Sequence, residues 1–354
     1  MTMTYTDIQR LKAKITRLYA HRSQNILLGA EEQVRLVDES PSIYHLVRKW
    51  KRCMRSHVAM VKDEEGVVHM ASRESLDIFT RALEIKLQEH RIDGTAMERM
   101  LAHVKKEIPP GEQDALYLPF TDVELHNAVM SGKKWKAPGS DGISNDLFRS
   151  AWNIIRVDLL ELLNAMYLDG PVAPAQIKGI VVYVPKLANP VMVTDYRSIT
   201  LLNSDIKLYA RLIANRLKPI LEEVLHPGQF CGVRNNTILD AIAAIRDTLA
   251  ETELTNEPLC VLSLDFKDAF DRVAHEYLYG VLKHYGVTDW LVERIRALYD
   301  TATSQAQLNG FLSKSVPLQR SVRQGCPLSM LLFNVCLDPF LRSIEEKIRP
   351  ARPP

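Results

Sequence analysis

Apolar residues recur through most of the chain at intervals of three and four, which is the spacing of one face of an α-helix. This pattern predicts helices over 6–37, 72–90, 95–106, 145–168, 204–225, 273–285 and 288–299, one that ends near 252 and one that begins near 328. A further helix begins at residue 121 or 122, because Thr121 and Asp122 are both suited to cap a first helical turn.

Three segments have the pattern of β-strands. Residues 177–186 are an apolar run that ends in a proline and Lys186. Residues 303–319 read as a hairpin around Asn309-Gly310, a dipeptide typical of two-residue turns. Residues 259–264, LCVLSL, are a short apolar run followed by Asp265. We predict a buried strand there, with the Asp265 carboxylate at its end.

Composition excludes several classes of protein. Of the 354 residues, 46% are hydrophobic and 25% are charged, with a formal net charge of +2. The five cysteines have no CxxC spacing, so neither a disulfide framework nor a zinc site is favoured. No apolar run approaches the roughly 18 residues of a membrane span, and the N-terminus lacks a signal-peptide core. We expect an intracellular protein without a membrane partner, whether nuclear or cytoplasmic.

Two stretches are locally basic. The first, 41–62, interleaves aromatic residues with cations and contains no acid; its cations include Arg48, Lys49, Lys51, Arg52 and Arg55. The second, 178–218, has seven basic residues and two acids. Cations beside aromatic rings suit a nucleic-acid backbone with stacked bases. The alternative for the first stretch is a solvated basic helix face.

Asp265 is the first candidate for chemistry. A carboxylate at the end of a buried strand is costly to desolvate unless it binds a metal or is well hydrogen-bonded. Taken alone, the motif favours an aspartate that caps the following turn. Its neighbours Phe266 and Phe270 could be ordinary core aromatics. An aspartyl phosphotransferase would need a second acid two residues on, where Lys267 stands, so we set that reading aside.

Four motifs stand in order along the chain: KAPGSDGI, PK followed by YRSI, LDFKDAF, and RQGCPLS. Together they resemble the reverse transcriptase domain of non-LTR (LINE-type) retrotransposons. The resemblance implies an α+β, right-hand polymerase fold with fingers and an incomplete palm. A break at 108–113, where two prolines and a glycine interrupt the helical pattern, sets the first boundary. We expect a helical basic extension over 1–108, fingers over 109–258 and an incomplete palm over 259–354.

The resemblance also implies the chemistry of the site. Asp265 matches the catalytic aspartate that binds two Mg²⁺ ions, and the backbone carbonyl of Phe266 is a further metal ligand. Lys186 and Arg197 match the residues that grip the incoming triphosphate. Phe270 matches the ring that excludes a 2′-hydroxyl. Gln324 and Gly325 match the motif that contacts the nucleotide and the templating base.

Other residues match positions that bind nucleic acid in that family. Arg323 is expected on a backbone phosphate, with a surface cation as the alternative. The remaining ones are expected in the fingers loop and in a template-side loop; they are Lys136, Gly139, Asp141, Gln229 and Arg234. The implied partners are an RNA template, a DNA primer and deoxynucleoside triphosphates. The oligomeric state is not indicated.

The sequence departs from the family pattern in two respects. Serines stand at 140 and 198, where a proline is usual, so those loops are expected to be less rigid. The Tyr/Phe-Ala-Asp-Asp motif, whose aspartates complete the metal site, is missing, since Asp-Asp occurs nowhere in the sequence. We therefore expect a fragment or a decayed copy that is inactive alone. The alternative function is a non-catalytic nucleic-acid-binding remnant of such an element.

Overall fold

The computed structural model describes residues 58–348, apart from 106, 135, 234–235 and 257. These residues divide into two compact units, each made of three separate stretches of the chain. Unit 1 consists of the described part of 1–86 together with 119–212 and 297–318. Unit 2 consists of 87–118, 213–296 and the described residues from 319 onward. The strands of the described chain all lie in unit 1.

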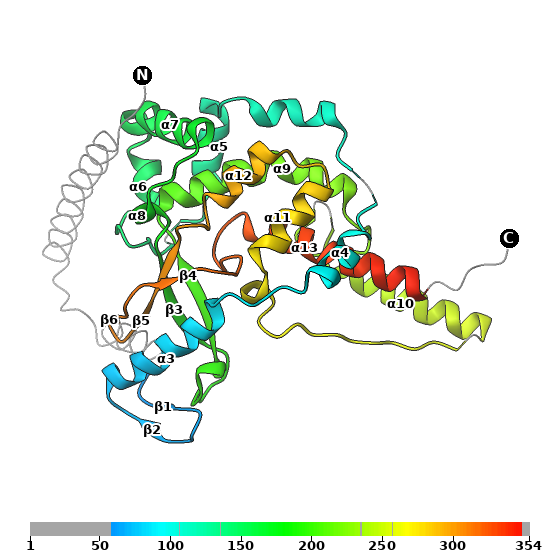
Figure 1. Cartoon of the computed structure of the whole chain (residues 1–354), viewed down its shortest axis with the longest axis horizontal. Helices are drawn as coiled ribbons and strands as arrows, with labels where there is room; N and C mark the ends of the chain where they lie inside the picture. Colours follow the sequence, from blue (N-terminus) through cyan, green and yellow to red (C-terminus); the bar gives the residue numbers. More distant parts are fainter. Residues whose placement is uncertain (1–57, 106, 135, 234–235, 257, 349–354) are drawn as a thin grey trace, which may run out of the picture. The chain divides into compact units, whose positions relative to one another are not determined.

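Unit 1 is built on a mixed five-stranded sheet, visible in Figure 1 as the green and orange arrows. Its strands are β3 (Gly179–Pro185), β4 (Tyr196–Leu201), β5 (Thr303–Leu308), β6 (Phe311–Leu312) and β7 (Val316–Pro317). Strand β3 pairs antiparallel with β4 and parallel with β5, while β6 and β7 both pair antiparallel with β5. A separate two-stranded ladder joins β1 (Val61–Lys62) to β2 (Val68–His69).

The predicted hairpin at Asn309-Gly310 is confirmed. Both residues have positive φ, 50° and 88°, between β5 and β6. A two-residue turn with this geometry matches the right-handed twist of the strands that it joins. The strand predicted over 177–186 is also confirmed as β3.

Unit 1 also contains helices. They are α3 (Ser72–Leu87), α5 (Asp122–Met130), α6 (Asn145–Ser150), α7 (Trp152–Asp169), α8 (Pro174–Ile177), the short η2 (Val193–Asp195) and the first half of α9 (Ser204–Val224). Thr121 caps α5 through a capping box with Glu124, as the sequence indicated. The buried rings of Phe120, Tyr167 and Tyr209 meet in the core, with the first two centroids 4.2 Å apart.

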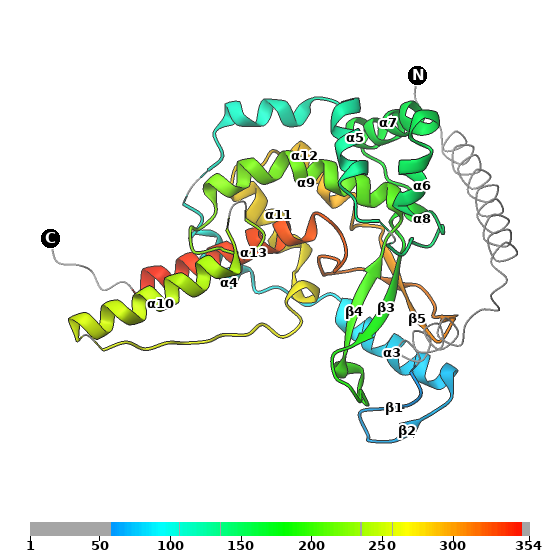
Figure 2. The ribbon, with the colours of Figure 1, turned by 180° about the vertical axis from the view of Figure 1, so that it is seen from behind.

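The described part of unit 2 consists of helices and irregular segments. Its helices are α4 (Gly94–Leu101), η1 (Pro110–Tyr117), the second half of α9, α10 (Ile238–Thr255), η3 (Ala269–Arg272), α11 (His275–His284), α12 (Asp289–Arg296) and α13 (Ser329–Ile348). Helices α4, α11 and α13 pack on one another, and Figure 2 shows the chain from behind. None of the described helices is long and apolar enough to cross a membrane.

The predicted buried strand over 259–264 is wrong. The segment has no regular secondary structure, and its side chains are exposed, for example 69% at Val261 and 74% at Leu262. Cys260, which the apolar run suggested was buried, is exposed as well. A strand needs a neighbour for its backbone N–H and C=O groups, and no strand among the described residues pairs with this segment. The apolar pattern alone does not show whether a neighbouring strand is present.

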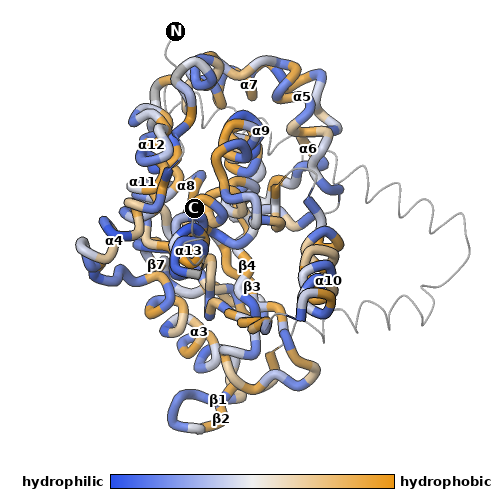
Figure 3. Tube along the Cα trace, turned by 90° about the vertical axis from the view of Figure 1, so that its right-hand side faces the viewer, coloured by the Kyte–Doolittle hydropathy of each residue, from blue (hydrophilic) through white to orange (hydrophobic). Residues whose placement is uncertain are grey.

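Helix α10 leaves its apolar residues uncovered in the same way. The isoleucines 238, 242 and 245 and Leu249 recur at helical spacing and are 43–75% exposed. Figure 3 shows hydrophobic positions in orange along α10. The helix ends where Asn256 adopts a left-handed conformation with φ of 56°.

Candidate functional site

Lys186 and Arg197 lie at the same end of one hairpin in unit 1. Lys186 directly follows β3, and Arg197 in β4 pairs with Val184. Opposed residues on antiparallel strands share a face, as do residues two positions apart along a strand. Both cationic side chains are exposed. The structure therefore places both residues at the same end of one hairpin, and their contact with a triphosphate stays a prediction.

Asp195 holds the turn beside Lys186. Its Oδ2 accepts hydrogen bonds from the backbone N–H groups of Met192 at 2.8 Å and Val191 at 2.9 Å. These bonds lower the pKa of Asp195 below its usual value, with a smaller contribution from the charge of Lys186. Lys186 donates its backbone N–H to Asp195 O at 2.7 Å and its ammonium to Thr194 O at 2.9 Å. These two hydrogen bonds thus hold Lys186 at the tip of the hairpin.

Helix α3 supports the same hairpin through aromatic packing. The Phe79 ring lies 4.4 Å from the Tyr183 ring and 5.3 Å from the Tyr196 ring. Burial raises the pKa of Tyr196, so its hydroxyl stays neutral. Lys86 Nζ donates to Ser198 Oγ at 3.1 Å. Ser198 therefore ties β4 to α3.

The loop over 136–144 is packed against the start of α9 in unit 1. A Cβ atom added to Gly139 would come within 2.3 Å of Asn203 N, so this position needs a glycine. Buried Asn203 accepts hydrogen bonds at Oδ1 from Ser140 Oγ at 3.1 Å and from Asp141 N at 3.3 Å. Sequence analysis did not single out Asn203, because its partners come from a loop about sixty residues away. Lys136 is exposed at the start of this loop.

Asp141 is engaged within its own turn. Its Oδ1 accepts a hydrogen bond from Ile143 N at 3.0 Å. An aspartate in this arrangement stabilises a turn. In this structure Asp141 and Gly139 hold the conformation of the loop. A role for them in binding nucleic acid stays a prediction.

Asp265 and Phe266 lie in the exposed irregular segment of unit 2 rather than at the end of a strand. The Phe266 ring is 49% exposed and meets the Phe340 ring edge-on, with centroids 5.6 Å apart. The carboxylate of Asp265 is therefore open to water. The position of Asp265 corrects the expectation that a buried strand presents it.

Phe270 is tied to the segment that precedes the RQG motif. The backbone O of Phe270 accepts a hydrogen bond from Val322 N at 2.9 Å, and Val273 O accepts one from Ser321 N at 2.8 Å. An isolated antiparallel bridge between Ala274 and Arg320 continues this pairing. Two motifs that are fifty residues apart in the sequence thus lie side by side in unit 2.

The RQG motif itself forms a turn. Cys326 N donates to Arg323 O at 3.1 Å, and Gly325 has φ of +124°, which favours glycine. Gln324 is half-buried and Gly325 is exposed. Arg323 is only 3% exposed, so the reading of Arg323 as a surface cation is wrong. Its guanidinium could contact a phosphate only after local rearrangement.

Of the two residues predicted on the template side, the structure describes Gln229 and not Arg234. Gln229 is 7% exposed in a loop where its backbone O accepts a hydrogen bond from Asn236 Nδ2. A buried glutamine packs the loop, and its contact with a template stays a prediction. The other candidates lie outside the described residues; they are Arg234, Arg48, Lys49, Lys51, Arg52 and Arg55.

The described residues do not by themselves form a two-ion metal site. No group of three His, Cys, Asp or Glu side chains within the described chain is arranged to bind a metal ion. Mg²⁺ needs several oxygen ligands near octahedral geometry. That Asp265 and the carbonyl of Phe266 are two of these ligands stays a prediction.

Comparison with known proteins decides the family. Residues 184–351 match the family described as "Reverse transcriptase (RNA-dependent DNA polymerase)". The chain belongs to the reverse transcriptases. This match contains Lys186, Arg197 and the whole of the LDFKDAF and RQG motifs. Reverse transcriptases use a divalent metal, an RNA template, a primer and nucleotide substrates.

The relatives are proteins of non-LTR retrotransposons. "Transposon TX1 uncharacterized 149 kDa protein" of Xenopus laevis is 33% identical over 67% of this chain and 18% of its own length. The "Retrovirus-related Pol polyprotein from type-1 retrotransposable element R2" of Popillia japonica is 30% identical over 65% of this chain and 31% of its own length. The "RNA-directed DNA polymerase from mobile element jockey" of Drosophila melanogaster is 23% identical over 83% of this chain and 32% of its own length. The chain thus spans at most about a third of each.

Proposed function

We propose that this chain supplies the nucleotide-handling part of an RNA-templated DNA polymerase from a non-LTR retrotransposon. One observation carries the proposal. Within the matched family region, backbone hydrogen bonds at 2.8–2.9 Å hold the segment from Phe270 to Val273 against Ser321 and Val322. This pairing supports a site in which the Asp265 segment and the Gln324-Gly325 turn act on one nucleotide.

Each side chain has a role in this proposal. Lys186 and Arg197 neutralise and align the triphosphate, because an ammonium and a planar guanidinium both donate to phosphate oxygens. The flat ring of Phe270 excludes a 2′-hydroxyl and so favours deoxynucleotides. Gln324 and Gly325 contact the nucleotide and the templating base.

The nucleic-acid contacts complete the assignment. Lys136 and Arg234 bind backbone phosphates, and the buried Arg323 does so after a local rearrangement. Gly139, Asp141 and Gln229 shape the loops around the template. The basic residues between 48 and 55 extend this surface. The partners are an RNA template, a DNA primer and deoxynucleoside triphosphates.

We also propose the finer architecture. The chain has a right-hand polymerase fold, with a helical extension over 1–108, fingers over 109–258 and palm over 259–354. The location is intracellular. The mixed sheet and the helices support the α+β class, whereas the two compact units have other boundaries than 108 and 258.

The proposed metal is Mg²⁺, as two ions. Asp265 and the carbonyl of Phe266 would hold one side of that site, and bound metal would acidify the primer 3′-hydroxyl and stabilise the departing pyrophosphate. A second carboxylate pair has to come from elsewhere, because the described residues offer none beside Asp265. We therefore expect no polymerisation by this chain alone.

Primer extension on a poly(rA) template with Mg²⁺ and deoxynucleotides tests the proposal. The chain is assayed alone and as a fusion to the Ala-Asp-Asp strand pair and thumb of a relative. We expect activity in the fusion only. Asp265→Asn should abolish it, because losing a metal ligand costs more than the roughly hundredfold loss from a misplaced group. Asp268→Asn is the control, since Asp268 is an exposed neighbour with φ of 55°, which asparagine tolerates.

The outcomes separate the possible readings. Activity in the chain alone would show that its metal site is complete. Activity that survives Asp265→Asn in the fusion would show that another carboxylate is catalytic. Nucleic-acid binding without activity in a folded fusion would favour the non-catalytic remnant.

A further inference from the structure

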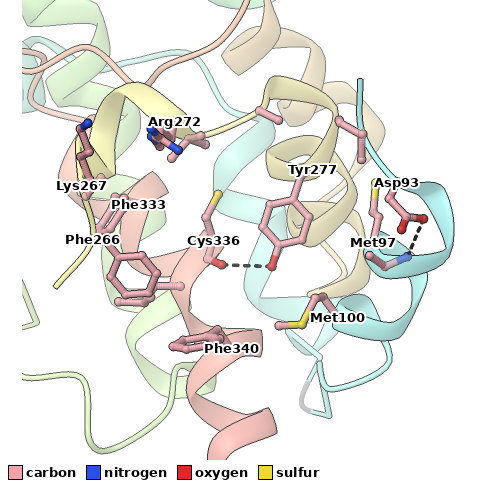
Figure 4. Close-up of a pocket in the computed structure, with 16 residues that line it drawn as sticks. Asp93, Met97, Met100, Phe266, Lys267, Arg272, Tyr277, Phe333, Cys336 and Phe340 are labelled. Carbon is pink, nitrogen blue, oxygen red and sulfur yellow. Dashed lines mark hydrogen bonds between the residues drawn. The ribbon is translucent and has the colours of Figure 1, made fainter. Parts of the chain in front are cut away.

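Unit 2 contains an apolar cavity that the polymerase chemistry leaves unused. It has a volume of about 480 Å³ and four walls: the start of α4, the segment 266–274, Tyr277 of α11 and one side of α13. Figure 4 shows the side chains that converge on it. Small-molecule sites in proteins are usually about 300–1,000 Å³ and mostly apolar, so this cavity has the size of a ligand site.

The walls are aromatic and sulfur-rich. The rings of Phe266, Phe333 and Phe340 line one side, and the thioethers of Met97 and Met100 line the other. Aromatic faces and thioethers both pack well against a flat ring. The lining therefore favours a planar aromatic body over a branched aliphatic one.

The polar groups of the wall are already engaged. The Tyr277 hydroxyl donates to Cys336 O at 3.1 Å, and burial raises the pKa of both Tyr277 and Cys336, so the two stay neutral. The Asp93 carboxylate caps α4 by accepting from Thr95 N and Ala96 N. A nucleobase inserted here would leave its polar edge without partners, which is costly. The body of the ligand should thus be apolar at its edge.

The mouth of the cavity is cationic on one side. Lys267 and Arg272 lie beside Phe266 and Phe333, whereas Asp93 lies on the opposite side (Figure 4). A cation at the mouth attracts an anionic group while the apolar walls bury the rest of the molecule.

We propose that this cavity binds a flat, apolar aromatic molecule that carries one anionic group. The rings pack between the phenylalanines and the methionines, and the anion meets Lys267 and Arg272.

The cavity is also coupled to the nucleotide site. Phe333 lines the cavity and stacks on Phe270, with ring centroids 4.8 Å apart and planes at 14°. Phe266, another lining residue, directly follows Asp265. A ligand that moves either ring therefore moves the segment from Asp265 to Phe270. This second part of the proposal rests on the proposed polymerase function, and occupancy should change activity.

Binding is tested first, without any activity readout. The probes are 8-anilinonaphthalene-1-sulfonate, an aromatic anion whose largest part is the flat naphthalene ring, and N-phenyl-1-naphthylamine, the same ring system without the sulfonate. Both are titrated by fluorescence against the whole chain. Ala96→Phe fills the cavity and should weaken both probes at least tenfold. Ala102→Phe is the matched control, because Ala102 is exposed at the end of the same helix and does not line the cavity. It should change affinity less than twofold.

A second variant tests the charge at the mouth. Lys267→Gln combined with Arg272→Gln should weaken the sulfonate probe about tenfold, which corresponds to roughly 1.4 kcal/mol, and leave the neutral probe within twofold. Circular dichroism checks that each variant is folded. Because both changes lie at the mouth, this variant remains informative if Ala96→Phe fails to fold.

Three results would overturn the binding site. Equal binding to Ala96→Phe and to the parent chain would place the probes on other exposed apolar surfaces, such as α10. If the double variant lost the same affinity for both probes, the ligand would not need an anionic group. Displacement of the probe by a deoxynucleotide or a short oligonucleotide at matched occupancy would make the cavity a nucleic-acid site.

The coupling is tested in the primer-extension fusion. Saturating probe should change the extension rate of the parent fusion severalfold and leave the Ala96→Phe fusion unaffected. If the fusion is inactive without probe, the polymerase proposal fails, and the binding result is unaffected. If the probe binds and the rate is unchanged, the link through Phe333 is wrong.

Discussion

The rings of Phe270 and Phe333 are stacked, with centroids 4.8 Å apart and planes inclined by 14°. Phe270 follows the catalytic candidate Asp265 by five residues, and Phe333 belongs to α13. The segment that carries Asp265 has no regular structure before η3. The stack therefore helps to anchor this segment to a helix of unit 2.

A double-mutant cycle should detect the stack. Phe270→Ala and Phe333→Ala each destabilise unit 2, and their coupling should be about 0.5–1.5 kcal/mol, the range for aromatic pairs. The free energy of unfolding in urea measures it. The control cycle pairs Phe333 with Phe120, which lies in the core of unit 1. Its coupling should stay below about 0.5 kcal/mol. Equal coupling in the two cycles would contradict a direct stack.

Binding of a primer–template duplex should depend steeply on salt and little on sequence. Each phosphate contact contributes a slope of roughly −0.7 to −0.9 in log affinity against log salt concentration. Lys136→Gln should reduce the slope by about one such contact. Lys314→Gln is the control, because Lys314 is exposed and pairs with Glu84 at 2.7 Å. Fluorescence anisotropy across a salt titration measures both. A flat titration of the parent chain would count against any nucleic-acid role.

Gly139→Ala should destabilise unit 1. The added Cβ would meet Asn203 N at 2.3 Å, and backbone cannot move away cheaply. Overpacking of this kind costs about 1–3 kcal/mol. Gly94→Ala serves as control, since nothing lies within 4 Å of its Cβ and alanine favours the first turn of α4. Thermal unfolding followed by circular dichroism should show a lower midpoint for Gly139→Ala alone. Similar midpoints would mean that the 136–144 loop yields easily.

Asp338 should be among the most costly carboxylates to change. It is fully buried and accepts hydrogen bonds from His226 N and Arg342 Nε, each at 2.5 Å, and from the Tyr285 hydroxyl. Asp338→Asn leaves the Arg342 guanidinium, which is 13% exposed, without its counter-charge. Breaking a buried pair costs about 3–5 kcal/mol.

The control for Asp338 is Asp247→Asn. Asp247 pairs with Arg246 on α10, where the side chains are 67% and 76% exposed. Exposed pairs contribute about 0–1 kcal/mol. Urea unfolding at constant pH compares the two variants. A loss at Asp338 no larger than at Asp247 would show that the buried network is dispensable.

Acid should weaken the protein partly through His275. Burial lowers the pKa of His275, and the nearby Arg323 charge lowers it further, although Nε2 donates to Ser321 O at 2.9 Å and this bond opposes the shift. The unfolded chain then binds a proton more readily than the folded one. As pH falls from about 6.5, the ordinary value of histidine, towards the lower folded value, the free energy of unfolding decreases.

His275→Gln should remove that part of the pH dependence. Urea unfolding of parent and variant at pH 7.5 and pH 5 gives the difference. The parent should lose more free energy of unfolding on acidification than the variant does. An identical loss in both proteins would show that His275 is protonated equally in the folded and unfolded states.

Local patterns in the sequence predicted most of the elements. The long helix over 204–225 appears as α9, and the helix that begins at Thr121 or Asp122 appears as α5 with the capping box. Asn309-Gly310 forms the predicted turn. These features depend on residues within a few positions of one another, so the sequence carries their determinants directly.

Some features of the candidate site were likewise predictable from the sequence, and others were not. The strand over 177–186 was predicted, and the resemblance assigned Lys186 and Arg197 to the triphosphate. That both residues stand on one hairpin is visible only in the pairing of β3 with β4. The order of the motifs was likewise sufficient to identify the family. The burial of Arg323 was not visible in the sequence, because burial depends on how distant parts of the chain pack.

By itself, the sequence determined the helical periods, the caps, the turns and the family to which the motifs belong. Only the tertiary structure decided that the run over 259–264 is exposed and unpaired, that Asn203 holds the Gly139 loop, and that Phe333 stacks on Phe270. The physical reason is that a strand, a buried amide and an aromatic stack each need a partner from a distant part of the chain. An apolar run indicates that a segment favours burial, but which segment packs against it depends on the tertiary fold.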